Sequence, residues 1–218
     1  TSLNRRLDYN NIFSLDRLGE NDMVEGGQSL TLGLEYSKKD KKNQDYLNLS
    51  VANVIRDKKN PDLPIKSSMA ETRSDLIGKF DFIPSKFFDL EYEFSVDKNL
   101  KHSNFNFVKT NFRVNNIVTS FEFLEEDNFI GEKSYLSNKT SFNFDDRNSI
   151  SFGTSKNLDK NITEYYNLIY EYKNDCLIAA VEYDKQYYTD NELKPEQNLF
   201  LSIKIVPFGK IDTPSIKW

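Results

Sequence analysis

Cysteine, histidine and tryptophan each occur once in this chain of 218 residues, as Cys176, His102 and Trp218. One cysteine excludes a disulfide within the chain, so any bridge needs a partner outside it. One histidine excludes a multi-histidine metal site, and a His-based triad would have to recruit His102 from a short polar loop. The chain also lacks the GxxxxGKS/T phosphate loop and the GxGxxG fingerprint. We therefore predict no enzymatic activity, no metal site and no cofactor.

Long apolar runs are also missing, and none approaches the roughly 18 residues that a membrane helix needs. The chain begins at Thr1, without a charged segment followed by an apolar one, so no export signal is visible. We expect an internal piece of a longer exported protein. The net charge of -5 argues against a nucleic-acid surface, which is normally basic.

Aromatic residues are plentiful instead: 17 Phe and 12 Tyr stand in a chain that is only 38% hydrophobic, with a mean hydropathy of -0.66. Transmembrane β-barrels have this composition, because only alternate strand residues meet lipid. We predict an all-β fold, an antiparallel up-and-down portion of a transmembrane barrel with about eleven strands. Residues 1–218 would form the C-terminal part of one barrel domain, with 1–28 as an external loop, 29–206 as strands and 207–218 as a tail.

Alternation of apolar and polar residues supports this prediction from about residue 29 onwards. The clearest segment is 88–96, where Phe88, Leu90, Tyr92, Phe94 and Val96 alternate with polar residues. The apolar side would form an aromatic outer face and the polar side a water-filled lumen. We assign seven polar residues to the lumen: Asp89, Glu91, Glu93, Asn167, Glu171, Lys173 and Glu182. Carboxylates at i and i+2 of one strand are better explained as a wetted wall than as a catalytic acid and base.

Two turns fix the predicted registers. A two-residue turn at Asn115–Asn116 places like residues opposite each other in the flanking strands. A two-residue turn at Asn174–Asp175 would place Tyr172 opposite Leu177 and Tyr170 opposite Ala179, which again matches apolar with apolar. A slip of one residue would mix the two faces.

Connection lengths form a second pattern. Short links at 83–86, 115–116, 145–147 and 174–175 alternate with longer polar ones at 56–73, 98–102, 125–133, 156–162 and 188–197; the lysine-rich link at 38–45 is an exception. Outer-membrane barrels have short periplasmic turns and longer external loops. The acidic clusters at 125–127 and 190–192 lack the spacing of a calcium loop, so we interpret them as solvated charge.

Cys176 follows the second turn, where a thiol at the periplasmic rim could reach a neighbouring domain. An unpaired small residue explains the position equally well. Trp218 is either an aromatic assembly signal or an ordinary tail residue, since two prolines separate it from the last strand.

Two segments resemble one family. Residues 10–36, NNIFSLDRLGENDMVEGGQSLTLGLEY, are similar to the Asn-x-Phe…Asp-Arg-x-Glu-x-Gly-x-Arg-Leu-x-Tyr-Gly-Leu stretch of the LptD family of lipopolysaccharide-assembly proteins. Residues 172–176, YKNDC, and 201–209, LSIKIVPFG, resemble that family's terminal hairpin and closing strand. Met23 and Ser29 stand where the family often has arginine, which does not favour an ion pair in the loop.

The resemblance implies a transport component of the Gram-negative outer membrane that inserts lipopolysaccharide into the outer leaflet through a barrel of about 26 strands. The lateral gate would be formed by the last strand, with Leu199, Leu201, Ile203 and Ile205. Cys176 would be disulfide-bonded to a periplasmic N-terminal domain that lies outside this chain. The implied partners are an LptE-like lipoprotein plug and an LptA-like periplasmic bridge that reaches the barrel through that domain.

Two alternatives remain open from the sequence. A diffusion porin shares the architecture but lacks a large periplasmic domain before the barrel. A soluble all-β binding module, such as a sandwich or a lipocalin-like barrel, would need no detergent for extraction.

Overall fold

The computed structural model describes residues 6–15, 17, 25–60, 63, 68–128, 131–187, 196–205, 209–212 and 216–217. Eleven long strands and two short ones make up the regular structure of these residues. They are β1 (Ser29–Lys39), β2 (Asp45–Arg56), β3 (Leu76–Ser85), β4 (Phe88–Val96), β5 (Ser103–Val114), β6 (Ile117–Asn128), β7 (Gly131–Asn143), β8 (Asn148–Asn157), β9 (Ile162–Lys173), β10 (Leu177–Gln186), β11 (Glu196–Ile205), β12 (Gly209–Asp212) and β13 (Ile216–Lys217). Among the described segments, none is a helix that is long and apolar enough to cross a membrane.

Hydrogen bonds join the strands in sequence order from β1 to β12, and β13 pairs with β11. The predicted all-β, antiparallel, up-and-down class is therefore confirmed, and so are the eleven long strands. The order begins at β1 and ends at β12, so the described strands do not close into a barrel. β12 and β13 fall within the segment that was expected to be a tail.

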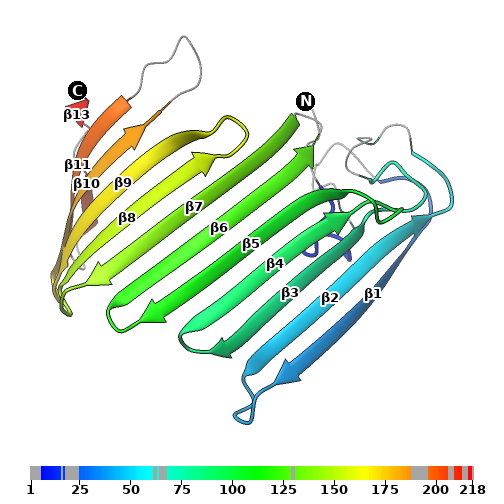
Figure 1. Ribbon diagram of the computed structural model, residues 1–218, viewed down its shortest axis with the longest axis horizontal. Helices are drawn as coiled ribbons and strands as arrows, with labels where there is room; N and C mark the ends of the chain where they lie inside the picture. The colour runs from blue at the N-terminus through cyan, green and yellow to red at the C-terminus, as the bar shows by residue number, and fades with distance from the viewer. Residues whose placement is uncertain are drawn as a thin grey trace. The chain divides into compact units, whose positions relative to one another are not determined.

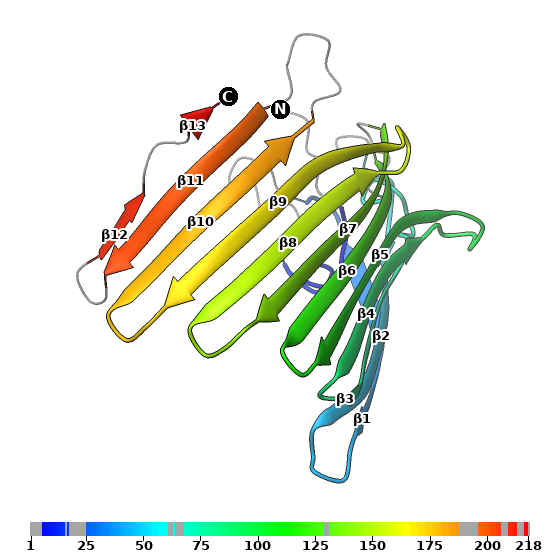
Figure 2. The ribbon, with the colours of Figure 1, turned by 60° about the vertical axis from the view of Figure 1, so that its left-hand side comes forward.

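The chain divides into two compact units, which are described separately. The first comprises residues 1–109 and 123–134, and the second comprises residues 110–122 and 135–218. Figure 1 shows β1 to β4 of the first unit side by side, in blue to green. Figure 2 shows β8 to β11 of the second unit, with β12 and β13 following β11.

Cross-strand pairing in the first unit sorts side chains as the alternation predicts. Leu34 lies opposite Val51 and Tyr36 lies opposite Leu49, while Leu49 also pairs with Phe80. Because successive side chains point to opposite faces, these apolar residues share one face across β1, β2 and β3. The same period places the intervening polar residues on the other face.

The predicted turn at Asn115–Asn116 is confirmed, since β5 ends at Val114 and β6 begins at Ile117. Asn115 has a φ of 51°, a left-handed conformation that asparagine tolerates well and that two-residue hairpin turns require.

The predicted register of the β9–β10 hairpin is wrong by two residues. Tyr172 lies opposite Ala179 rather than Leu177, and Lys173 pairs with Ile178. The cause is the Asn174 side chain, whose Oδ1 accepts hydrogen bonds from the backbone N–H of Cys176 at 2.9 Å and of Leu177 at 2.8 Å. This local bonding closes a four-residue turn. A slip of two residues preserves the faces, so the apolar and polar sets remain separate.

Several other predicted connections have different bounds. The link expected at 125–133 is mostly strand, because β6 continues to Asn128 and β7 begins at Gly131. The links expected at 156–162 and 83–86 shorten to residues 158–161 and 86–87 in the same way. Glu126 of the 125–127 cluster lies in β6 and pairs with Arg6 at 3.3 Å, so this carboxylate is not simply solvated charge. The residues of the 190–192 cluster and Trp218 lie outside the described part of the chain.

The buried core lies on one face of the first unit, and irregular segments cover it. Leu7 and Ile12, which precede β1, pack with Ala52, Val54 and Ile77 of the sheet, and residues of the β2–β3 connection complete the cluster. Ile12 and Val54 are fully buried. We call this side of β1 to β5 the covered face, and the opposite side the apolar face.

Candidate functional site

The apolar face of the first unit is open to its surroundings. Leu30, Leu32, Leu34 and Tyr36 of β1 are 54% to 69% exposed. Together with Leu49 and Ile55 of β2 they make a contiguous exposed apolar surface. Soluble monomers rarely present such a surface, because water penalises it; a lipid or protein environment does not.

The second unit repeats this apolar face. The register places Ile150 opposite Tyr170, Tyr170 opposite Val181, and Val181 opposite Leu201. Tyr170, Val181 and Leu201 are between 41% and 43% exposed. They therefore lie on a common open surface, as the sequence predicts, and not in an enclosed core.

The covered face of the first unit is polar at its centre. Lys79 donates hydrogen bonds to Glu91 and Glu93 across β3 and β4. Asp89 belongs to the same face by strand alternation. The structure thus brings together the three carboxylates that the sequence assigns to a lumen. It also supplies Lys79 as the ion-pair partner of Glu91 and Glu93, so these two carboxylates belong to an ion-pair network.

A buried ion-pair triad fastens the segment before β1 to the covered face. Glu25 Oε1 accepts hydrogen bonds from Arg17 Nη1 and Arg56 Nη2, both at 2.6 Å. All three side chains are at least nine-tenths buried. Arg17 also donates to the backbone oxygen of Ile12 at 3.0 Å and to Thr31 Oγ1 at 2.9 Å. Met23 and Ser29 did not favour an ion pair in the loop, but Arg17 and Arg56 supply one with Glu25.

A second contact ties this segment to the far edge of the first unit. The Arg6 guanidinium lies 3.2 Å from the centroid of the Phe105 ring, and Arg6 Nη1 bonds Glu126. A cation over an aromatic ring is favourable, more so when it is shielded from water. Phe105 is only 6% exposed, so this aromatic on the polar side of its strand is explained by the segment that covers it.

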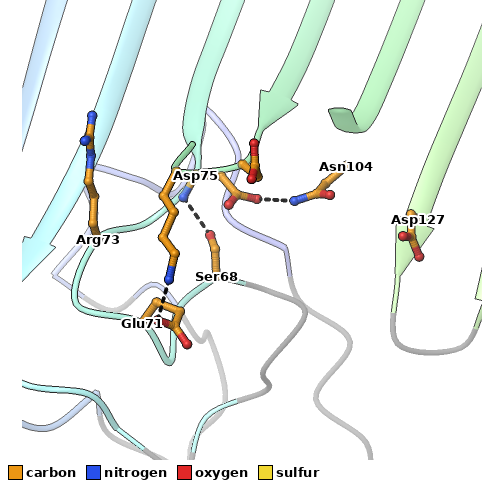
Figure 3. A pocket seen from close by; sticks show the side chains of 8 residues that line it. Ser68, Glu71, Arg73, Asp75, Asn104 and Asp127 are labelled. Atoms are coloured by element: carbon orange, nitrogen blue, oxygen red, sulfur yellow. Dashed lines mark hydrogen bonds and ion pairs between the residues drawn. The ribbon is translucent and has the colours of Figure 1, made fainter. Parts of the chain in front are cut away.

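A small pocket opens at the end of the first unit where β2 and β3 are connected. Its cavity of about 170 Å³ is lined by Ser68, Glu71, Arg73, Asp75, Asp97, Lys98, Asn104 and Asp127. Figure 3 shows Asn104 pointing toward Asp75, with Asp127 standing apart. Asp75 accepts hydrogen bonds from Asn104 Nδ2 at 2.8 Å and Ser95 Oγ at 3.1 Å.

Two carboxylates of this loop-end pocket, Asp75 and Glu71, have shifted pKa values. Burial raises the pKa of Asp75 above its usual range, although the hydrogen bonds from Asn104 and Ser95 oppose the shift. Hydrogen bonds from Lys98 and Lys59 lower the pKa of Glu71. Among the described residues, no group of three or more His, Cys, Asp or Glu side chains is placed to hold a metal ion. Asp75 and Glu71 thus have hydrogen-bond partners among the described residues.

The polar face of the second unit carries the other predicted lumen residues. Asn167 donates a hydrogen bond to Glu182 across β9 and β10. Glu171 lies opposite Ala180 and Lys173 lies opposite Ile178 on the same side of the sheet. All four predicted residues share this face, which we call the polar face.

The predicted gate residues Leu199, Leu201, Ile203 and Ile205 lie in β11 and alternate on its apolar side. One edge of β11 pairs with β10 along its whole length. The other edge pairs with β12, where Ile203 lies opposite Ile211, and with β13, where Leu199 lies opposite Ile216. The chain's own C-terminal strands thus occupy this edge, which the sequence analysis did not anticipate.

Cys176 lies in the β9–β10 turn as an exposed free thiol. His102 lies in the turn between β4 and β5, where its backbone N–H donates to Asp97 Oδ1 at 3.1 Å.

The covering segment is the main feature that sequence reasoning missed. One signal was available: Gly33, Ser50 and Ala52 are small residues at the polar phase of β1 and β2, where a packed segment needs room. A Cβ at Gly33 would stand 2.6 Å from Cζ of Phe13. Small side chains on one face of a sheet therefore indicated a close neighbour.

In each unit the described strands form an antiparallel sheet with an open apolar face and an opposite face that carries polar side chains. The family model described as LptD, LPS transport system D, matches residues 2–136. The chain belongs to the LptD family. This is a lipopolysaccharide transport and assembly family and not an enzyme family. A comparison with curated proteins gave no match.

Proposed function

We propose that this chain is the C-terminal barrel segment of an outer-membrane translocon that inserts lipopolysaccharide into the outer leaflet. The observation that carries the proposal is the apolar face, exposed along both units and backed by a polar face. Hydrocarbon would cover the apolar side, and the polar side would line an aqueous route for a charged sugar head group. Earlier strands, supplied by the rest of the protein, would complete the barrel.

Complementation tests this function. Depletion of the full-length protein should reduce lipopolysaccharide at the cell surface and cause it to accumulate inside, and expression of the wild-type protein should restore the surface level. Surface lipopolysaccharide that is unchanged by depletion would refute the proposal.

Lateral release at β11 is the proposed exit. Among the described residues, the edge of β11 that faces away from β10 has the short pairings with β12 and β13 and no others. β11 forms four residue pairs with β12 and two with β13, which hold the strands together less tightly than the ten pairs with β10. Lipid would leave where these short pairings open.

Two engineered disulfides that share one residue test this exit in the full-length protein carrying Cys176→Ser. Ile203→Cys with Ile211→Cys locks β11 to β12, and Ile203→Cys with Ala179→Cys locks β11 to β10. Facing positions of antiparallel strands are close enough for a disulfide. The first lock should block export until reductant is added, and the second should not. Normal export with a fully formed first lock contradicts lateral release at this edge.

Partners follow from the same proposal. Cys176 is exposed in a turn, where it would form a disulfide with the periplasmic domain of the full-length protein. A lipoprotein plug of the LptE type would sit inside the completed barrel, and a periplasmic bridge of the LptA type would deliver lipid through the N-terminal domain. A Cys176→Ser variant should lose the mobility difference between reduced and non-reduced samples on a gel, and a retained difference would exclude this bridge.

A further inference from the structure

The polar face of the second unit contains a row of side chains that runs straight across the sheet. The register aligns Lys139 of β7 with Gly153 of β8, Gly153 with Asn167 of β9, and Asn167 with Asp184 of β10. The four aligned residues thus present, in order, a cation, a position without a side chain, an amide and a carboxylate. The gap exists because glycine has no side chain.

A hollow of about 350 Å³ lies at this gap, and we call it the Gly153 hollow. Besides the row, its lining includes Ser151, Tyr165 and Gln186. The volume is at the lower end of the range for small-ligand sites, which is roughly 300–1,000 Å³. All the residues that line it belong to β7, β8, β9 and β10.

The hydrogen-bonding groups around the hollow are arranged in two sets. Gln186 Nε2 donates to Asp184 Oδ2 at 2.7 Å, which fixes the carboxylate on one side. Asn167 Nδ2 donates a hydrogen bond to Glu182 Oε1, which fixes the orientation of the amide. On the opposite side, Lys139 has no ion pair with any described residue and is exposed. Oriented carboxylate and amide groups on one side suit hydroxyls, and a free ammonium on the other suits an anion.

Tyr165 supplies an aromatic surface beside these polar groups and is 37% exposed. An aromatic ring offers an apolar face to the C–H side of a sugar ring while its hydroxyl stays available for hydrogen bonding. A ring, planar polar groups and one free cation within a single small hollow are what a pyranose with an acidic substituent requires.

We propose that the Gly153 hollow is a subsite for one sugar ring that bears a phosphate or carboxylate, with the anionic group at Lys139 and the hydroxyls at Asp184 and Asn167. The inference rests on the proposed function in taking this sugar from the lipopolysaccharide head group. A second polar hollow of about 400 Å³, lined in part by Arg147, Ser149 and Glu171, lies next along β8 and β9 toward their turns. The two hollows form consecutive polar positions along the same strands.

The test measures binding of a soluble probe, the oligosaccharide obtained from lipopolysaccharide by removing its fatty acids, to the full-length protein in detergent by calorimetry. Gly153→Phe fills the hollow and should raise Kd by about tenfold or more. Thr154→Phe adds the same side chain at the next residue of β8, which points to the opposite face. It should leave Kd unchanged within about twofold.

Lys139→Gln tests the contribution of the positive charge to oligosaccharide binding separately from the shape of the hollow. It should weaken binding of the phosphorylated oligosaccharide by about fivefold and leave the dephosphorylated oligosaccharide unaffected. Since Lys139 is exposed, this variant keeps the proposal testable if Gly153→Phe fails to fold, which heat-dependent gel mobility would reveal. Equal Kd values for wild type and both site variants would overturn the proposal.

Two other outcomes also overturn it. If Gly153→Phe releases a co-purified lipoprotein but leaves oligosaccharide binding intact, the hollow accepts a protein side chain. If depletion abolishes surface lipopolysaccharide while neither variant changes oligosaccharide binding, the transport function stands and the subsite is wrong. Unchanged surface lipopolysaccharide on depletion refutes the transport function instead, whatever the binding results.

Discussion

Arg17 and Glu25 meet at 2.6 Å with both side chains at least nine-tenths buried, although neither residue belongs to a helix or strand. Glu25 is shared with Arg56, so the triad joins the segment before β1 to the end of β2. It carries one excess positive charge, and Arg56 Nη1 is buried without a hydrogen-bond partner. Glu25 is the central member of the triad, because it is the partner of both arginines.

Arg17→Ala should lower the free energy of unfolding by about 2–3 kcal/mol, because it removes a buried, charge-assisted hydrogen bond to Glu25. The variant also loses the hydrogen bonds to Ile12 and Thr31. Urea unfolding of the full-length protein in detergent measures the change.

Lys59→Ala is the control for this prediction. Lys59 is 65% exposed, and its partner Glu71 keeps a second cation in Lys98. Exposed pairs contribute less than about 1 kcal/mol. A comparable loss from both variants would show that burial does not set the strength of the triad.

Gly78→Ala should destabilise the first unit. An added Cβ would overlap the ring of Phe94, whose Cζ and Cε atoms lie across the glycine. Forcing the ring away costs about 1–3 kcal/mol. Gly153→Ala is the matched comparison, because its nearest heavy atoms would be 3.8 Å away; its unfolding free energy should stay within about 0.5 kcal/mol of wild type.

Asp75 should make stability depend on pH. Burial raises its pKa in the folded state above the unfolded value near 3.8. The stability it contributes is therefore fully present below that value and is lost as the pH rises through the folded pKa. Asp75→Asn removes this titration, so wild type should gain stability relative to the variant as the pH falls from 7 toward 4. Unfolding curves at both pH values measure the difference.

Asp97 should make stability depend on pH in the opposite direction. Backbone N–H groups of His102 and Lys101 donate to its carboxylate and lower its pKa. Asp97→Asn should therefore cost stability at pH 7, and this cost should disappear as the pH falls through the lowered pKa. If both aspartate variants respond to pH in the same direction, the assignment of their environments is wrong.

Face assignments could be predicted from sequence because the side-chain period of a strand is two. Tyr170 and Leu201 reach the predicted face even though the β9–β10 register is displaced by two residues. The register could not be predicted in the same way, because it depends on Asn174. The side-chain oxygen of Asn174 accepts hydrogen bonds from two backbone N–H groups of the turn. A residue that bonds its own backbone neighbours can lengthen a turn without changing composition or alternation.

The covering segment and the hollow were beyond sequence reasoning for a different reason. Leu7 and Ile12 stand in no periodic pattern, so nothing local indicates that they pack on Val54. Gly153 is an isolated glycine in a strand, and its importance depends on its cross-strand neighbours Lys139 and Asn167. Which residues face each other depends on the strand register, and alternation does not fix it, because a shift of two residues keeps every side chain on the same face.

The two-faced sheet is tested most directly by solvent accessibility along β9 of the full-length protein in lipid bilayers. Single cysteines at positions 166 to 171, in a Cys176→Ser background, carry spin labels, and collisions with oxygen and with a water-soluble nickel chelate are compared. We predict that oxygen dominates at the even positions and the chelate at the odd positions, a period of two. Equal chelate accessibility at Leu168 and Asn167, or a pattern without that period, would contradict the account.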